Sequence, residues 1–145
     1  MLFKNDESSL QLDVYAYEFP PDGGDPTSDD RNWLVLRATW INEDGNVVKD
    51  SNSCLLTYEL REMNAGLKVL GAGIKDRYDS AFVEPYFELS AQADGERFLV
   101  DVSFYLPNTM DGEDTAEIEV SMTAEELKAL TGELDKLCEK FPDRA

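Results

Sequence analysis

The chain has 145 residues with a formal net charge of −18, and it contains no histidine. Because like charges repel, this balance predicts that neither nucleic acid nor an anionic membrane is a partner, and it favours a basic protein surface instead. The missing histidine removes the side chain that most often performs acid–base catalysis and binds metals, so the composition favours binding over catalysis.

The size and apolar content predict one folded unit. An apolar fraction of 42% indicates a packed core rather than a disordered acidic chain. A chain of this length builds one core, which predicts a single domain over residues 1–145. No apolar run approaches the length of a membrane span, and the N-terminus lacks the apolar centre of a signal peptide. We therefore expect a cytoplasmic protein, and the strong net charge favours a monomer.

The first half of the chain predicts three strands and a helix. Apolar residues alternate with polar ones over 10–16, the pattern of a strand with one buried face. Residues 33–41 are apolar in both alternating sets, which indicates a central strand covered on both faces. A turn over 42–46 leads into a further strand at Val47–Val48. The helix that follows ends at Gly71, and its apolar stripe consists of Leu60, Met63, Leu67 and Leu70.

The second half predicts three more strands in succession. Residues 82–93 and 96–106 flank Asp94-Gly95, a dipeptide typical of a two-residue type I′ turn. A third strand covers 116–122, where apolar residues alternate with mainly acidic ones. Because alternate side chains point to opposite faces of a strand, the three strands present an acidic outer face.

A helix closes the chain. Thr123 and Glu126 form a capping box at its start, and Pro142 ends it. Gly66 and Gly132 each weaken one of the two helices by about 1 kcal/mol relative to Ala, so both helices must depend on packing. The expected fold is therefore α+β, an antiparallel β-sheet of about six strands with two helices packed on it, the second at the C-terminus.

Few catalytic or metal-binding schemes fit the sequence. A pair of carboxylates for hydrolysis is the main one left open, and Glu59 and Glu84 suit it because each lies among apolar neighbours, where a carboxyl group is costly to ionise. A carboxylate-dependent hydrolase or small-ligand-binding module using these two residues is thus the alternative function. The acidic loops 22–30 and 111–114 lack the ligand spacing of a calcium loop. We therefore expect no metal, no cofactor and no enzymatic activity.

Five short segments, in this order and spacing, resemble the WapI-type immunity proteins of bacteria. They span nearly the whole chain: Tyr17-Glu18-Phe19-Pro20, Asn32-Trp33-Leu34, Cys54-Leu55-Leu56-Thr57-Tyr58-Glu59-Leu60, Phe82-Val83-Glu84-Pro85 and Lys140-Phe141-Pro142-Asp143-Arg144. The resemblance implies a small protein that binds and neutralises the toxin domain of a partner polymorphic toxin. Such toxins are often nucleases, which carry a basic groove for phosphate, and an acidic inhibitor suits that groove. The charge balance favours the same kind of partner independently.

The segments shared with the family are interpreted as core or turn residues that set the fold. Partner specificity normally depends on exposed, variable surface. The candidate partner-binding residues are therefore the exposed acids Asp22, Asp25, Asp29, Asp30, Asp111, Glu113, Asp114, Glu117 and Glu119. Two other interpretations stay open: these acids only keep the sheet soluble and protect its edge, or the chain is a structural or regulatory domain that pairs through an exposed edge.

Overall fold

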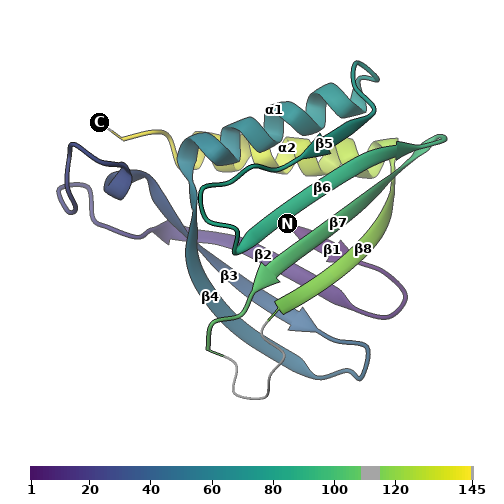
Figure 1. Ribbon diagram of the computed structural model, residues 1–145, viewed down its shortest axis with the longest axis horizontal. Coiled ribbons are helices and arrows are strands. Elements are labelled where there is room, and N and C mark those ends of the chain that lie inside the picture. Colours follow the sequence, from purple (N-terminus) through teal and green to yellow (C-terminus); the bar gives the residue numbers. More distant parts are fainter. Residues whose placement is uncertain (109–114, 145) are drawn as a thin grey trace.

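In the computed structural model, residues 1–108 and 115–144 form two four-stranded antiparallel sheets and two α-helices (Figure 1). The first sheet has the order β1 (Leu2–Lys4), β2 (Ser9–Tyr17), β3 (Trp33–Ile41) and β4 (Val47–Leu56). The second has the order β5 (Arg77–Asp79), β6 (Phe87–Asp94), β7 (Arg97–Tyr105) and β8 (Thr115–Thr123). Helix α1 (Thr57–Gly71) connects the sheets, α2 (Ala124–Lys140) follows β8, and a short 3-10 helix η1 (Asp29–Asn32) precedes β3.

The α+β class and the two helices are confirmed, but the strand count and the single sheet are wrong. The described residues contain eight strands rather than about six, divided between two sheets. The two strands that the sequence did not indicate, β1 and β5, have three residues each. That length is too short to show an alternating pattern. Helix α1 separates β4 from β5, so the chain starts a second sheet instead of extending the first.

Two details of the strands also differ from expectation. In β3, one alternating set is buried, whereas Ile41 on the other face is 37% exposed, so this strand is covered on one face only. At the second turn, Asp94 pairs with Arg97, which leaves Gly95 and Glu96 as the two loop residues. Gly95 has φ +61° and is the loop's only positive φ, which identifies a type II′ turn instead of type I′.

The inner faces of both sheets and the apolar stripes of both helices share one core. Its members include Leu36 of β3, Val102 of β7, Leu67 of α1 and Leu134 of α2. The helices lie side by side across one end of the sheets (Figure 1). The predicted cap of α2 is present, because Thr123 accepts a hydrogen bond from the Glu126 amide and the Glu126 carboxylate accepts one from the Thr123 amide. This packing leaves the outer faces of both sheets open to solvent.

Candidate functional site

The outer face of the second sheet is hollowed into a trough of about 520 Å³. Strands β6, β7 and β8 contribute most of its lining, and β5 adds one edge. Five of the lining residues are acidic, and we call them the trough acids: Asp79, Glu88, Asp101, Glu117 and Glu119. All five are exposed, so their charges face any partner that lies on the sheet.

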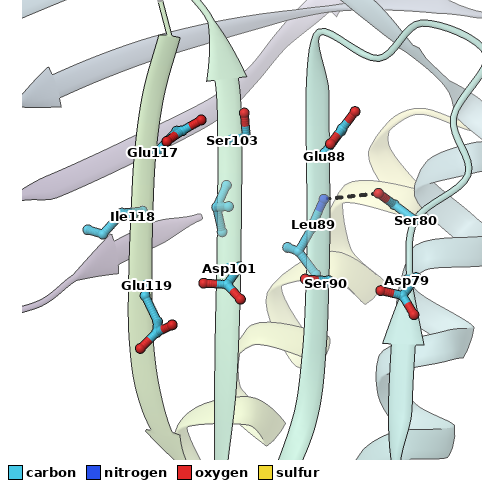
Figure 2. A pocket seen from close by; sticks show the side chains of 11 residues that line it. Asp79, Ser80, Glu88, Leu89, Ser90, Asp101, Ser103, Glu117, Ile118 and Glu119 are labelled. Atoms are coloured by element: carbon cyan, nitrogen blue, oxygen red, sulfur yellow. Dashed lines mark hydrogen bonds between the residues drawn. The ribbon is translucent and has the colours of Figure 1, made fainter.

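The pairing register places the trough acids in two rows across the strands (Figure 2). One row runs Asp79, Ser90, Asp101 and Glu119. The other runs Glu88, Ser103 and Glu117. Because successive outward side chains along a strand are two residues apart, the two rows are neighbours on the same face.

The trough is negative because little within it neutralises the acids. Asp79 forms an ion pair with Arg77, whose Nε lies 2.8 Å from Oδ2. Within the described part of the chain, the other four trough acids have no lysine or arginine at ion-pair distance, although the Arg77 charge also acts on Asp101. Asp101 lies directly opposite Glu119, and like charges in that position destabilise a sheet, by roughly 0.2–1 kcal/mol. The sheet therefore carries this charge at a cost to its own stability.

Each row contains a serine that lies between two acids. Ser103 has Glu88 and Glu117 on the neighbouring strands, and Ser90 has Asp79 and Asp101. The acids that flank one serine are two strands apart, about 10 Å between their Cα atoms. Because a serine side chain is short, each of these serines leaves room between the two carboxylates that flank it. A lysine or arginine side chain of a partner fits such a gap by charge.

Two of the predicted partner-binding residues, Glu117 and Glu119, belong to this trough. The prediction missed its other three members, Asp79, Glu88 and Asp101. For Glu88 and Asp101 a signal was present, since both occupy the polar positions of alternating strands on either side of the Gly95 turn. Asp79 lies in the three-residue strand β5, which the sequence pattern does not reveal.

The predicted acids of loop 22–30 lie elsewhere and partly serve the loop itself. Asp25 accepts hydrogen bonds from the amide and hydroxyl of Thr27, at 2.9 and 2.7 Å, and these bonds lower the pKa of its carboxyl group. Asp30 accepts one from the Asp25 amide at 2.9 Å. Asp29 accepts one from the Tyr58 hydroxyl at 3.4 Å, and Asp22 is exposed. In Figure 1 the loop lies beside the C-terminus at the left, away from β8 on the right.

The structure therefore does not bring loop 22–30 together with the trough. The remaining predicted acids, Asp111, Glu113 and Asp114, lie outside the described residues.

The carboxyl groups proposed for hydrolysis have a different setting. Glu59 is buried, with 3% of its surface exposed, and both of its oxygens accept backbone hydrogen bonds. Oε1 accepts from the Leu56 amide at 3.0 Å and Oε2 from the Val83 amide at 2.7 Å. Glu84 is half-buried. Glu59 thus connects the start of α1 to the segment before β6, and neither residue lines the trough.

The two cysteines are free thiols, and only Cys54 is buried. Glu59 and Glu84 both act on it electrostatically. Burial, followed by these two carboxylates, raises the pKa of the Cys54 thiol to about 12. The thiol is therefore unreactive near neutral pH.

Comparison with known families identifies the protein family of this chain. The profile of the family described as "Immunity protein WapI-like family" matches residues 1–142. The chain belongs to the WapI-like immunity protein family. Membership confirms the resemblance seen in the sequence and supports an immunity role, which implies a cognate toxin as partner.

Other comparisons add little. A chain from a structure described as "Structure of a guideRNA-binding protein complex bound to a gRNA" matches with 16% identity and a TM-score of 0.41, over 90% of this chain and 89% of that one. A likeness this distant carries no argument. No curated protein matches the chain.

Segments that carry the WapI-like resemblance meet in space as a scaffold. The Tyr17 hydroxyl donates to the Pro142 carbonyl, and the Arg144 guanidinium lies 3.3 Å from the centre of the Tyr17 ring. Asn32 exchanges hydrogen bonds with the backbone of Arg144, at 3.2 and 2.7 Å. The Phe141 ring packs edge-on against the same tyrosine. These contacts tie the C-terminal segment to the region before β3, which agrees with a structural role for the shared segments.

Within residues 1–108 and 115–144, no helix is long and apolar enough to cross a membrane. Over the same ranges, no three Cys, Asp or Glu side chains converge in a way that would hold a metal ion.

Proposed function

We propose that this WapI-like protein neutralises a cognate toxin domain by stoichiometric binding rather than by catalysis, and that the trough is a principal contact surface. The observation that supports this most directly is the row in which Asp101 faces Glu119, with no ion pair to either carboxylate among the described residues. Such a pair lowers the stability of the sheet. A basic partner that covers the trough would remove the repulsion, so the charge has a use in the complex that it lacks in the free protein.

The proposed toxin surface is basic, and the phosphate-binding groove of a nuclease is one surface with that property. A nuclease groove is lined by cations that normally contact phosphates. Rows of carboxylates on a concave sheet present negative charge to such cations, and the high net charge would speed the encounter. In this role, residues 1–145 act as one monomeric, cytoplasmic domain that needs no cofactor and binds neither nucleic acid nor membrane.

The acids outside the trough have a secondary role in the proposed function. Asp22 and Asp29 would add charge at a second surface, because loop 22–30 lies away from the trough. The hydrolase alternative loses support, since both oxygens of Glu59 already accept backbone hydrogen bonds. A carboxylate held in this way is typical of a structural group.

The test is the association kinetics of this protein with the basic toxin domain encoded beside its gene. The variant is Asp101→Asn with Glu119→Gln, and the control is Asp13→Asn, an exposed mid-strand acid on the outer face of the first sheet. We expect one-to-one binding that weakens as salt rises. The trough variant should associate several-fold more slowly with a shallower salt dependence, and the control should match the wild type.

Two results would contradict the proposal at different points. Absence of binding to the neighbouring toxin domain would remove the neutralising role itself. Tight binding with equal association rates for both variants would keep that role and remove the trough as the contact surface.

A further inference from the structure

An aromatic pair continues the outer face of the second sheet beyond the acidic rows. The rings of Tyr86 and Tyr105 lie 5.3 Å apart between centres, inclined by 31°. The Tyr105 amide donates to the Tyr86 carbonyl at 2.7 Å, so Tyr86, which directly precedes β6, lies opposite Tyr105 of β7. Tyr86 precedes Glu88 by two residues and Tyr105 follows Ser103 by two. The pair therefore forms the next row on the face that carries the trough acids.

Tyr86 is open to solvent, and Tyr105 is half-buried. Tyr86 is 41% exposed. Elsewhere, Arg37 covers the Tyr15 ring at 3.2 Å from its centre and Arg144 covers the Tyr17 ring at 3.3 Å. Among the described residues, no arginine or lysine covers the rings of Tyr86 and Tyr105 in this way. An open aromatic surface beside unneutralised carboxylates suits a cation that also has an apolar, planar face.

We propose that Tyr86 and Tyr105 form the aromatic anchor of the toxin interface and receive an arginine side chain of the partner. This inference rests on the proposed function, and it names the residue type that the surface selects. An arginine over Ser103 would have Glu88 on one side, Glu117 on the other and the tyrosine rings at one end. Its guanidinium is planar and binds carboxylates through two parallel hydrogen bonds while stacking on aromatic rings. Lysine carries a point charge with no planar face and cannot form the paired hydrogen bonds, so the site favours arginine.

The acids and the aromatic pair would act on different steps of binding. Exposed charges mainly steer the encounter, so their loss lowers the association rate and its salt dependence. Buried aromatic anchors mainly hold the formed complex, so their loss raises the dissociation rate. A purely electrostatic interface would not show this separation, in which the acids set the association rate and the aromatic pair sets the dissociation rate.

The first experiment measures both rates for the neighbouring toxin domain with three variants. Tyr86→Ala removes the ring, Tyr86→Phe keeps it, and Tyr15→Ala is the control, since Tyr15 is 54% exposed on the outer face of the other sheet. We expect Tyr86→Ala to raise the dissociation rate about tenfold or more, with association rate and salt dependence unchanged. Tyr86→Phe and Tyr15→Ala should stay within about twofold of the wild type.

The outcomes separate this inference from the proposed function. If Asp101→Asn with Glu119→Gln slows association but Tyr86→Ala dissociates like the wild type, the anchor is wrong and the trough stands. If no variant changes either rate although the toxin binds, both surfaces are wrong. Thermal unfolding of each variant identifies any rate change that comes from a damaged fold.

The second experiment tests the choice of arginine without the toxin. Two capped peptides, Arg-Gly-Arg and Lys-Gly-Lys, are titrated into the labelled protein while amide chemical shifts are followed. We expect the arginine peptide to shift Ser103, Tyr105 and Tyr86 more strongly than the lysine peptide does. The difference should disappear in Tyr86→Ala. Equal shifts for both peptides, or shifts away from this row, would overturn the arginine site.

Discussion

At the scale of single residues, two glycines in helix interiors have opposite structural roles. A Cβ atom on Gly66 of α1 would overlap the ring of Tyr78 in β5. A Cβ atom on Gly132 of α2 would meet nothing within 4 Å. The sequence predicts the same cost for both, about 1 kcal/mol relative to Ala. The structure shows that only Gly66 has a reason to be glycine, since it allows β5 to approach α1.

The two glycines give a paired prediction. Gly66→Ala should lower the free energy of unfolding by about 1–3 kcal/mol, because the added methyl group overpacks against Tyr78. Gly132→Ala should raise it by about 1 kcal/mol through helix propensity. Urea denaturation of both variants measures these changes. A Gly66→Ala protein as stable as Gly132→Ala would show that β5 does not pack on α1 in this way.

Tyr78 itself gives a prediction about alkaline pH. Burial, followed by the nearby charge of Glu62, raises the pKa of the Tyr78 hydroxyl from 10.0 to about 12. Between these values the unfolded chain loses a proton that the folded protein keeps. The stability that Tyr78 contributes is therefore complete below about pH 10 and is lost as pH rises towards 12.

Tyr78→Phe should consequently lose less stability than the wild type between pH 10 and pH 12. Some loss should remain, since the buried Cys54 thiol also has its pKa raised, to about 12. Denaturation midpoints across this range provide the measurement. Parallel curves for the two proteins would rule out Tyr78 as a source of the alkaline transition.

At the scale of elements, the cross-strand rows show which features of the trough the alternating sequence of a strand can predict. Alternation correctly assigns Glu117 and Glu119 to an outer face. It does not give the partners of those residues, because pairing depends on the turn. The turn at Gly95 joins Asp94 to Arg97, and this register sets Ser90 opposite Asp101. The separate pairing of β7 with β8 sets Asp101 opposite Glu119. The trough thus follows from the turn and the register together.

The register predicts opposite effects for two aspartates at mid-strand positions. Asp101 faces Glu119, whereas Asp13 of β2 faces Arg37 of β3. Asp101→Asn should raise the free energy of unfolding by roughly 0.2–1 kcal/mol by removing a like-charge pair. Asp13→Asn should lower it by a similar amount. Denaturation at low salt is the appropriate measurement, and the difference should shrink as salt rises. If Asp101→Asn is the less stable protein, the repulsion across the trough does not exist.

At the scale of the whole molecule, the net charge of −18 acts against the folded state and in favour of a basic partner. Self-repulsion destabilises a compact chain, and salt screens it. Raising sodium chloride from low to physiological concentration and beyond should therefore increase the melting temperature of the free protein. The same salt series should weaken its complex with a basic toxin domain. Melting curves and binding measured in the same buffers check both expected salt effects. A melting temperature that falls as salt rises would contradict the expected stabilisation of the free protein.

The sequence by itself determined the α+β class, both helices, the capped start of α2, the family and an acidic outer surface. These properties depend on composition, on periodicity within one element and on short segments, all of which are local. Only the tertiary structure decided that the strands divide into two sheets, and that Asp79 joins Asp101 and Glu119 in one row. It also decided that loop 22–30 lies apart from the trough and that Glu59 is held by backbone amides. The physical reason is that these relations join residues far apart in the chain, so turn geometry and packing fix them rather than any local pattern.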